Sequence, residues 1–393
     1  MSEMINENWQ ATKNALLEGL NGHKKSVMDV TLENTRRYLA ESATAGATSA
    51  GNVATLNRVI LPVIRRVMPT VIANEIVGVQ PMTGPVSQIH TLRVRYSDTN
   101  NATGTANDVT AGDEALSPFK IGQAYAGDGT SGKAAGTAAL EGSAGNRLSI
   151  QILKQAVEAK SRKLSARWTF EAAQDAQAQQ GIDVEAEIMA ALAQEITAEI
   201  DQEVIGSLRT LAGTATETFD QAAVSGTATF VGDEHAALAV LVNRVANQIA
   251  TRTRRGAGNY AVVSPTALTI LQSATTSAFA RSTEGTFESP TNTKFVGTLN
   301  GAMRVYVDAY AADSTDVLVG YKGASEADAP AFYCPYIPLM SSGVVLDPAT
   351  FEPVVGFLTR YGYVELTNTA SSLGNAADYV GKVAITSANL KFK

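Results

Sequence analysis

One uninterrupted helical pattern, from Asp183 to Leu211, most constrains how this chain can fold. Its apolar residues recur at every fourth position with no Pro or Gly before Gly206, which is the spacing of a helix and not of a strand. They are Val184, Ile188, Leu192, Ile196, Ile200, Val204 and Leu208. At about 1.5 Å per residue this helix spans on the order of 40 Å. Because each four-residue step advances roughly 40° beyond a full turn, the apolar stripe spirals, and other elements must cover it from different sides.

The charged positions of this helix are all acidic until Arg209. They are Asp183, Glu185, Glu187, Glu195, Glu199, Asp201 and Glu203. An acidic series at regular spacing is more typical of a solvated or subunit-facing surface than of paired catalytic carboxylates. We therefore expect Glu187, Glu195, Glu199 and Glu203 to face a neighbouring subunit.

The composition limits the classes of partner. A chain of 393 residues can hold two or more subdomains. Its net charge of −7 argues against a dedicated nucleic-acid binder, because neutralising phosphates needs a surplus of Lys and Arg. Such a chain is better suited to enclosing DNA than to binding it directly.

The single cysteine, Cys334, excludes an intrachain disulfide and fits synthesis in a reducing cytoplasm. Without a long apolar run or a signal-peptide pattern, a soluble, non-secreted protein is expected.

Patterns in the N-terminal half predict both helices and strands. Residues 1–41 form an amphipathic terminal arm, and a further helix runs from Asn52 to Pro69. The chain is β-like from Val86 and again from Ile150 to Phe170. The intervening stretch, 97–146, is dominated by small and polar residues, so it is expected to be a loop excursion without a core of its own.

The C-terminal half predicts a compact α/β-like subdomain over residues 235–340. The pattern is a helix at 233–254, a strand at 259–264, a helix opened by Ser264-Pro265, and strands at 303–307 and 317–321. The last stretch, 344–366, is strand-rich and is expected to return and pack on the long helix.

The two β-like runs before the long helix carry a surplus of basic residues. The candidates for contact are Arg93, Arg95, Lys160, Arg162, Lys163 and Arg167. A basic two-stranded arm that leads into an acidic helix suits contact between copies of the chain, although a contact folded back within one chain is equally compatible. We expect these residues to lie over acidic positions of an adjacent subunit.

The sharpest enzyme-like pattern is GDGTSGKA, residues 127–134, which satisfies G-x-G-x-x-G and the G-x-x-x-x-G-K part of a phosphate-binding loop. A working loop needs a buried strand before it, a helix after it, and Ser or Thr after the lysine, whereas Ala134 follows Lys133. The match is expected by chance in a Gly-rich stretch. An NTPase that uses Gly127–Lys133 is therefore the enzymatic alternative and not the leading hypothesis.

Other reactive residue types are sparse. His23, His90 and His235 are isolated in sequence from any plausible ligand partner, which favours surface or packing roles over a metal site. Cys334 is flanked by aromatic and proline residues, and no histidine follows it, so a buried cysteine is favoured over a nucleophile. We expect no enzymatic activity, no metal and no cofactor.

The stretch VMPTVIANEIVGVQPMTGPVSQIHTLRVRY, residues 67–96, closely resembles the major capsid proteins of contractile-tailed, T-even-like bacteriophages. The corresponding segment in that family carries the same Gly-Val-Gln-Pro-Met-Thr-Gly-Pro run, here Gly78 to Pro85. Two further blocks, 159–188 and 295–362, agree as well. The three blocks lie in the same order as in the family and cover most of the chain after residue 60.

The resemblance implies the α+β fold of Hong-Kong-97-type capsid proteins. That fold has an N-terminal arm, an extended loop that reaches the neighbouring subunit, a peripheral domain built on a spine helix, and an axial domain. On this chain these would be the arm (1–50), the first part of the peripheral domain (51–85), the extended loop (86–168), the peripheral domain with spine helix 183–211 (169–234), the axial domain (235–343), and the peripheral return with a C-terminal tail (344–393).

The resemblance also implies a function. Members assemble into hexamers and pentamer-like capsomers that close an icosahedral shell around packaged double-stranded DNA, which would take place in the host bacterial cytoplasm. The implied partners are further copies of the chain, portal and scaffold proteins, and decoration or vertex proteins, with DNA enclosed without sequence-specific binding and no membrane. An encapsulin-like compartment, which uses the same fold to enclose cargo enzymes, is the structural alternative.

Two features of the resemblance yield further expectations. The run from Gly78 to Pro85, with Gln80, Pro81, Met82 and Gly84, is expected to redirect the chain from the peripheral domain into the loop, its glycines permitting backbone angles that other residues resist.

Relatives lose an N-terminal segment to a protease that favours Leu or Ile two positions before Glu, and Leu39-Ala40-Glu41 matches that preference. We nevertheless expect the mature chain to keep its arm.

Overall fold

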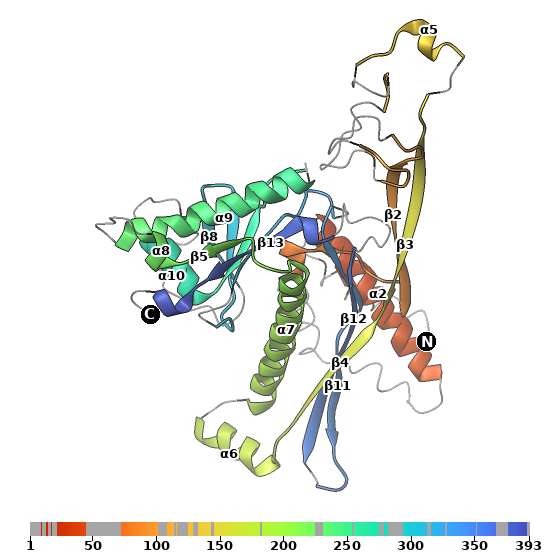
Figure 1. The fold of residues 1–393 in the computed structure, drawn as a ribbon. Coiled ribbons are helices and arrows are strands. Elements are labelled where there is room, and N and C mark those ends of the chain that lie inside the picture. The colour runs from red at the N-terminus through yellow and green to blue at the C-terminus, as the bar shows by residue number, and fades with distance from the viewer. Residues whose placement is uncertain are drawn as a thin grey trace. The chain divides into compact units, whose positions relative to one another are not determined.

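A computed structural model gives the fold of the chain (Figure 1). The structure describes residues 9, 13–14, 17, 22–44, 72–100, 108–113, 115, 125–128, 133–142, 145–180, 183–224, 231–253, 255–274, 279–281, 294–312, 316–326, 328–350, 352–366 and 376–390. The helix expected between Asn52 and Pro69 lies outside these residues.

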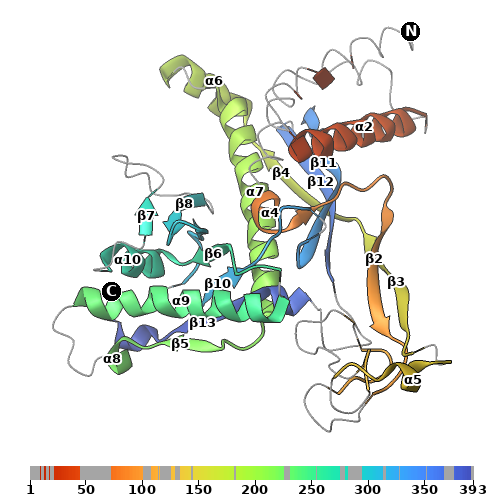
Figure 2. The same cartoon turned by 90° about the horizontal axis from the view of Figure 1, so that it is seen from above.

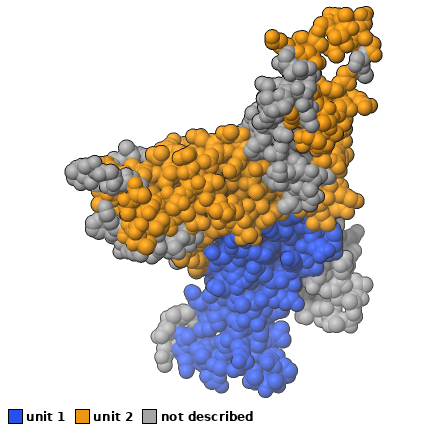
Figure 3. Space-filling model, in the orientation of Figure 1, with its two compact units in different colours: residues 1–87, 157–206, 332–364 blue, residues 88–156, 207–331, 365–393 orange. Residues whose placement is uncertain are grey.

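The chain divides into two compact units, which are coloured separately in Figure 3. Unit 1 comprises residues 1–87, 157–206 and 332–364, and unit 2 comprises residues 88–156, 207–331 and 365–393. Each unit joins three separate stretches of the chain, so its fold depends on contacts between residues far apart in sequence.

Unit 1 contains a four-stranded sheet in the order β1-β11-β12-β4. Its strands are β1 (Gly78–Val79), β4 (Lys160–Arg167), β11 (Ala331–Leu346) and β12 (Pro353–Glu365). β1 runs parallel to β11, and β4 runs antiparallel to β12 with Lys160 opposite Tyr361. Alternate residues of β12, from Val355 to Tyr361, are buried, because successive side chains of a strand point to opposite faces. The strand-rich character expected for 344–366 is confirmed.

The helices of unit 1 are α2 (Gly22–Thr44), α4 (Ala73–Ile76), α6 (Phe170–Gln180) and α7 (Val184–Leu211). The second half of the amphipathic arm predicted by sequence is α2, and it buries Met28 and Leu32. Its Asn34 side chain is 6% exposed and donates to the backbone oxygens of Met82 (2.6 Å) and Tyr336 (2.9 Å). This arm helix is therefore part of the core of unit 1.

The long helix α7 confirms the prediction made from residue spacing. Asp183 caps it, since its Oδ1 accepts from the backbone N–H of Glu185 at 3.1 Å and of Ala186 at 3.4 Å. The predicted stripe is buried from Leu192 onward, whereas Val184 and Ile188 are half-exposed. The buried apolar residues are Met189, Leu192, Ala193, Ile196, Ala198, Ile200, Val204, Ile205 and Leu208.

Unit 2 contains a seven-stranded mixed sheet in the order β5-β13-β10-β6-β9-β8-β7. Its strands are β5 (Glu217–Phe219), β6 (Tyr260–Val263), β7 (Phe279–Arg281), β8 (Lys294–Leu299), β9 (Met303–Val307), β10 (Val317–Gly320) and β13 (Val380–Ile385). The strands predicted near 259–264, 303–307 and 317–321 are β6, β9 and β10. The α/β-like subdomain expected from the pattern is thus present.

Two helices cover this sheet, α9 (Val231–Thr253) and α10 (Pro265–Ser273), and they contact each other (Figure 2). Ser264 caps α10 by accepting from the N–H of Ala267 at 3.2 Å, with Pro265 in the first turn, as the Ser-Pro pair predicts. One apolar cluster joins both helices to the strands and includes Leu238, Val242, Ile249, Ile270, Val305 and Val319. The shorter helical elements of unit 2 are α5 (Thr137–Leu140), α8 (Gln221–Val224), η1 (Ala376–Tyr379) and η2 (Ser387–Asn389).

The first β-like run and the first part of the second pair as a two-stranded sheet of β2 (Val86–Tyr96) and β3 (Leu148–Glu158). The rest of the second run, with its basic residues, is β4 in the sheet of unit 1, so the expectation that all of it belongs to the two-stranded arm is wrong. The excursion between them has a small apolar cluster, in which Tyr96, Val109, Ala115 and Tyr125 are buried and Val94 is packed against them. The rings of Tyr96 and Tyr125 meet edge to face at 4.6 Å between centroids. Tyr96 and Val94 belong to β2, so Val109, Ala115 and Tyr125 of the excursion are buried against that strand, and the expectation that the stretch lacks a core of its own stays a prediction.

None of the helices in the described parts of the chain is both long and apolar enough to cross a membrane.

Candidate functional site

An ion-pair cluster in unit 1 joins α7 to two strands of the sheet. From β4, Arg162 donates through Nη1 to Glu199 Oε2 and through Nη2 to Glu203 Oε2, both at 2.5 Å. Its Nε donates to the hydroxyl oxygen of Tyr361 at 2.5 Å, and the Tyr361 hydroxyl in turn donates to Glu203. Glu199 and Glu203 are four residues apart on α7, so they face the same side of the helix. The four side chains form one closed hydrogen-bonded network.

The register of the sheet places these side chains together. Arg162 lies opposite Thr359 and therefore one diagonal step from Tyr361 on the neighbouring strand. Thr359 is itself buried and donates to the backbone oxygen of Ile337 at 3.2 Å, which ties β12 to β11. The return of the 344–366 segment onto the long helix, expected from sequence, is confirmed by the Tyr361–Glu203 contact.

Three ionisable groups of this network each keep one protonation state near neutral pH. Partial burial lowers the pKa of Arg162, but its hydrogen bonds to Glu203 and Tyr361 outweigh this and raise the pKa above its usual value. Partial burial raises the pKa of Glu203, yet the hydrogen bonds from Arg162 and Tyr361, with the Arg162 charge, hold it below the usual range. Burial and donation to Glu203 raise the pKa of the Tyr361 hydroxyl. These three groups do not change protonation near neutral pH, so they suit structural bridging and not proton transfer.

The other predicted basic residues lie in different surroundings. Lys160 and Lys163 are exposed on β4, and Arg167 Nε lies 3.8 Å from Glu352 Oε2. The side chain of Arg93 is outside the described residues. Of the predicted acidic residues, Glu187 and Glu195 are exposed on α7 and are not part of the cluster. For Arg162 the contact lies within one chain, as the sequence left open, and the role of the exposed residues between copies remains a prediction.

Arg95 is only 8% exposed, unlike Lys160 and Lys163. The excursion folds back beside this end of β2, where Tyr96 N donates to Asp113 O at 2.9 Å and Ala115 N donates to Val94 O at 2.8 Å. These backbone pairs cover the strand on which Arg95 lies. Arg95 is therefore largely buried within its own chain, and its contact with a neighbouring copy stays a prediction.

The motif from Gly78 to Pro85 runs along β11 and then leads the chain to β2. After the β1 pairing, the N–H groups of Gln80 and Met82 donate to the backbone oxygens of Tyr333 and Pro335, each at 3.0 Å. Pro81 is half-buried, and Met82 is 1% exposed. At the end of the motif, Pro85 O accepts from Ala159 N at 2.9 Å, next to the start of β4. The motif is thus tied to the sheet of unit 1 along its length.

The reason expected for the glycines of this motif is wrong. Neither Gly78 nor Gly84 is among the described glycines with positive φ, and a Cβ on Gly84 would meet only Val86 O, at the ordinary contact distance of 3.7 Å. The φ angles of both glycines are thus ones that other residues adopt, and the motif is held by its hydrogen bonds to β11 instead.

Replacing Gly84 with Ala is therefore expected to leave the chain as stable as before or to stabilise it by up to about 1 kcal/mol, because alanine restricts the unfolded chain. Urea unfolding of the purified variant beside the wild type measures this difference. A loss above about 1 kcal/mol would show that the glycine is required for a reason that its φ and its contacts do not reveal.

The phosphate-loop pattern does not form a phosphate site in the parts of it that the structure describes. Asp128 N donates to Lys133 O at 3.0 Å, and a Cβ on Gly127 would lie 2.2 Å from the same oxygen. The Lys133 carbonyl oxygen therefore lies against Gly127 and Asp128, and an acceptor oxygen in this place does not suit a bound phosphate. The next helix, α5, has only four residues and begins at Thr137. The NTPase alternative gains no support.

Of the remaining reactive residues, His235 and Cys334 are buried. His235 is 6% exposed, with Nδ1 2.5 Å from Ser273 Oγ, and His90 is exposed on β2. The side chain of His23 lies outside the described residues. Burial raises the pKa of the Cys334 thiol to about 12, so it stays protonated and unreactive. Among the described residues, no group of three His, Cys, Asp or Glu side chains could hold a metal ion.

Comparison with known proteins decides the family. A sequence model of the family described as "Major capsid protein Gp23" matches residues 53–385. The chain belongs to the Gp23 family of phage major capsid proteins. The major capsid protein of Vibrio phage KVP40 is 31% identical to it, over 86% of this chain and 82% of the relative. That of Enterobacteria phage T4 is also 31% identical, over 83% of this chain and 78% of the relative.

Solved phage structures show weaker likenesses to this Gp23-family protein. A chain of Microbacterium phage Oxtober96 gives a TM-score of 0.47 at 12% identity, covering 80% of this chain and 90% of that one. The capsid of Myoviridae phage XM1 gives 0.43 at 12% identity, covering 79% and 88%. The family assignment rests on the sequence relatives and not on these likenesses, whose TM-scores are below 0.5.

As a Gp23-family member, the chain is a structural protein of the virion shell of a tailed phage, with an α+β fold. The matched region includes every element of the ion-pair cluster, namely β4, α7 and β12. Sequence reasoning found Arg162, Glu199 and Glu203 but missed Tyr361 and Asn34. Tyr361 could have been found, because it follows an arginine in a strand of alternating buried and exposed positions. Asn34 lies in a polar helix, and its sequence surroundings do not indicate a buried partner.

Proposed function

We propose that this Gp23-family chain assembles into hexamers and pentamer-like capsomers that close an icosahedral shell around packaged double-stranded DNA. The family match over residues 53–385 carries the proposal. The surface supports it, since β3 exposes Leu148, Ile150 and Ile152 by 56%, 68% and 66%, which is unusual for a lone soluble chain.

The segments of the chain take the roles of a capsid subunit. We assign them as an N-terminal arm (1–50), a peripheral domain (51–85, 169–234 and 344–393), an extended loop (86–168) and an axial domain (235–343). In unit 1, α7 is the spine, and the Arg162 cluster fixes it to the peripheral sheet. A fixed spine gives each copy the same interface geometry, which a closed symmetric assembly requires.

The net charge of −7 supports enclosure of DNA without sequence-specific binding, because groove and phosphate recognition need clustered basic residues. Portal and scaffold proteins, and decoration or vertex proteins, are the further partners of such a shell. Assembly takes place in the host bacterial cytoplasm. The subunit needs no catalytic group, metal or cofactor for this role, and no membrane.

The decisive experiment is electron microscopy of the purified protein and of particles from infected cells. Closed shells that contain double-stranded DNA are the expected result. Shells filled with a cargo enzyme would instead indicate an encapsulin-like compartment, and a protein that stays monomeric at high concentration would contradict the proposal.

The exposed basic residues of β4 are expected to contribute to contacts between copies. Lys163 is exposed beside the cluster but is not part of it, so Lys163→Glu changes the surface charge without removing the intrachain bridge. We expect the assembled fraction to fall about tenfold at low salt, as a loss of about 1.4 kcal/mol per contact would give. Sedimentation and electron microscopy measure it.

Lys133→Glu is the matched control, because Lys133 is also exposed but lies outside β3 and β4. Both variants carry the same change in net charge. If they assemble equally well, Lys163 has no part in the interface.

A further inference from the structure

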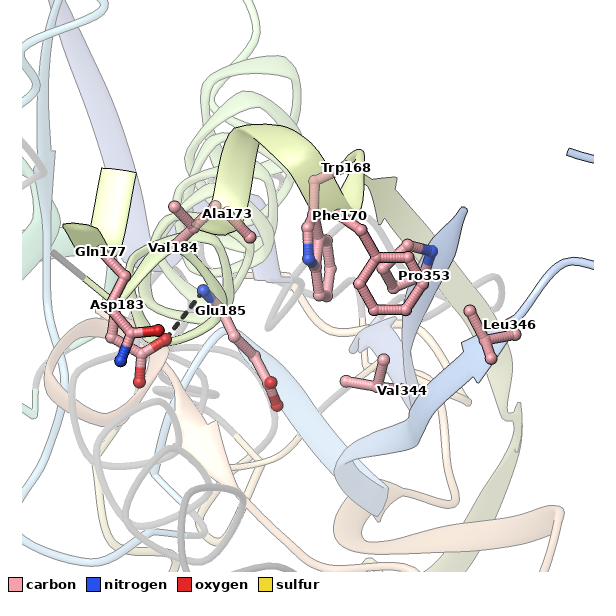
Figure 4. A pocket seen from close by; sticks show the side chains of 10 residues that line it. All are labelled: Trp168, Phe170, Ala173, Gln177, Asp183, Val184, Glu185, Val344, Leu346 and Pro353. Carbon is pink, nitrogen blue, oxygen red and sulfur yellow. Dashed lines mark hydrogen bonds between the residues drawn. The ribbon is translucent and has the colours of Figure 1, made fainter. Parts of the chain in front are cut away.

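A cluster of polar side chains in unit 2 is shut away from solvent. Gln221, Glu234 and His235 are 0%, 3% and 6% exposed. By contrast, the carboxylates that line the open groove of unit 1 stay within reach of water, since Asp183 is exposed and Glu185 is half-exposed (Figure 4). A buried carboxylate and imidazole are costly unless each has a specific partner, so the contacts of this cluster are informative.

The cluster joins three helices of unit 2. From α8, Gln221 Nε2 donates to Glu234 Oε2 of α9 at 2.7 Å and lies 3.4 Å from His235 Nε2 of the same helix. On the other side of the imidazole ring, His235 Nδ1 lies 2.5 Å from Ser273 Oγ, in the last turn of α10. One amide nitrogen therefore contacts both the carboxylate and the imidazole.

The neighbours of the His235 ring assign its proton. Ser273 Oγ donates its own hydrogen to Ile270 O at 3.1 Å, so it accepts from His235 Nδ1–H. Gln221 presents its NH₂ group to the Glu234 carboxylate, and the same group faces His235 Nε2. Nε2 is therefore the acceptor nitrogen, and the ring is neutral. Because Nδ1 already carries a hydrogen, it cannot take the proton of Ser273, so the two residues are not a catalytic pair in this state.

The short helix α8 depends on the Gln221 amide for its position. Of the side chains of α8 whose exposure the structure describes, Gln221 is buried, whereas Ala222 and Ala223 are exposed. Just before α8, Asp220 Oδ1 accepts from Ala222 N at 3.0 Å and from Asn389 Nδ2 at 2.9 Å, both at exposed positions. The Gln221 amide is thus the buried attachment of α8 to α9, which lie side by side (Figure 2).

We propose that Gln221, Glu234 and His235 form an acid-sensitive latch that holds α8 at neutral pH and releases it in acid. A second proton on His235 would sit on Nε2 and point at the hydrogens of the Gln221 NH₂ group. The charged ring would then attract the Glu234 carboxylate, which is separated from it by that one nitrogen, and the carboxylate would leave Gln221. Histidine is the side chain whose charge ordinarily changes between about pH 5 and 8. The latch lies within unit 2 of one chain, so it does not depend on assembly.

Glu234 is the charged group placed to respond to His235. The sequence has no ionisable side chain from Gln221 to Gly232 or from Pro265 to Ser273, and Asp233 of α9 is exposed. The ionisable side chains of β5, β13 and η1, which also contact α9, have partners of their own: Glu217 with Arg244 and Gln248, Lys382 with Asp316, Tyr379 with Asp328, and Asp378.

Nuclear magnetic resonance of the wild-type histidines is the first test. The chain has three, so full-length protein labelled with ¹⁵N at histidine gives three sets of ring signals, and the variants His23→Gln and His90→Gln identify two of them. We expect the His235 ring to carry its hydrogen on Nδ1 at pH 8 and to gain a second one on Nε2 by pH 5. A hydrogen on Nε2 at pH 8, or a ring that is still neutral at pH 5, would overturn the proposal.

Hydrogen exchange measures the release of α8 itself. Full-length wild type is compared with His235→Asn at the same pH, which cancels the intrinsic pH dependence of exchange. Asparagine can place an N–H near the position of Nδ1 but cannot become charged. The amides of residues 220–224 should exchange within about twofold of each other at pH 8, and about tenfold faster in wild type at pH 5. The same ratio at both pH values would contradict the latch.

A change at Glu234 tests the exchange of partners and does not require that His235→Asn folds. Glu234→Gln keeps an oxygen that can accept from Gln221 but removes the charge, so exchange in α8 should rise at a pH about one unit lower than in wild type. Asp233→Asn removes the exposed carboxylate beside it and should shift this pH by less than about 0.3 unit. Equal shifts in the two variants would assign the response to the general charge of α9 and overturn the proposal.

Discussion

Replacing Arg162 with alanine is expected to lower the free energy of unfolding of unit 1 by about 3 kcal/mol. The guanidinium makes three hydrogen bonds, two of them to carboxylates, and hydrogen bonds to charged groups contribute about 1.5–3 kcal/mol each before solvent exposure is considered. The Arg162 side chain is 31% exposed, which reduces the sum. Urea unfolding and calorimetry of the purified chain should show unit 1 unfolding earlier, by roughly 5 °C or more.

The same variant should change the dependence of stability on pH. The folded-state pKa of Glu203 lies below its usual value of 4.5, so the stabilisation is present above that pH and is lost as the pH falls through the folded pKa. In Arg162→Ala, the burial that raises the pKa of Glu203 is no longer opposed by the charge of Arg162. The acid side of the stability profile should therefore flatten below about pH 5, and a profile parallel to wild type would contradict the assignment.

Lys163→Ala is the matched control on the same strand. Lys163 is exposed and lies next to Arg162 in sequence, so its removal should change the free energy of unfolding by less than about 0.5 kcal/mol. If both variants lose the same stability, a general effect of charge on β4 is responsible and not the bridge to α7.

The long helix and the order of elements in unit 2 could be predicted because their signals are local. An apolar residue every fourth position predicts α7, and Ser264-Pro265 predicts the start of α10. By contrast, α6 carries almost no apolar pattern, since FEAAQDAQAQQ forms a helix from residues of high helix propensity and buries little. Periodicity cannot detect such a helix.

The pairing of strands in the sheet of unit 1 could not be predicted from the sequence. The sheet of unit 1 joins strands β1, β4, β11 and β12, and nothing in one short strand specifies a partner hundreds of residues away. The candidate site shows the same limit. Opposite charges on β4 and α7 indicated a contact, but the choice of Arg162 with Glu199 and Glu203 follows from the β4–β12 register, in which Tyr361 lies one diagonal step away.

Asp201 shows how a uniform pattern can hide an exception. It belongs to the acidic series of α7, yet it is 2% exposed and its Oδ1 accepts from Ile72 N at 2.8 Å, at the start of α4. The signal was available, because Val204, Ile205 and Leu208 follow it at helical spacing and place it on the apolar stripe. A charged residue on a buried face is expected to have a specific partner.

Asp201→Ala is expected to lower the free energy of unfolding by about 3 kcal/mol, comparable to Arg162→Ala. Truncation leaves the Ile72 N–H without this acceptor in a buried site, which costs about 1–3 kcal/mol, and also leaves a small cavity beside α4. Urea unfolding monitored by tryptophan fluorescence measures the loss. A change below about 0.5 kcal/mol would show that the contact is not needed to hold α4 against the spine.

Asp201→Asn separates the hydrogen bond from the charge. Its amide oxygen can still accept from Ile72 N, so the loss should be limited to about 1 kcal/mol if the hydrogen bond is the main contribution. The Asp201 charge is also one of the secondary causes, after burial and the charge of Tyr361, that raise the pKa of the buried Tyr333 hydroxyl. Because burial remains the first cause, the pKa of Tyr333 stays above its usual value in Asp201→Asn, and the comparison of the two variants rests on their stability. Equal losses from the alanine and asparagine variants would assign the stabilisation to the carboxylate charge instead.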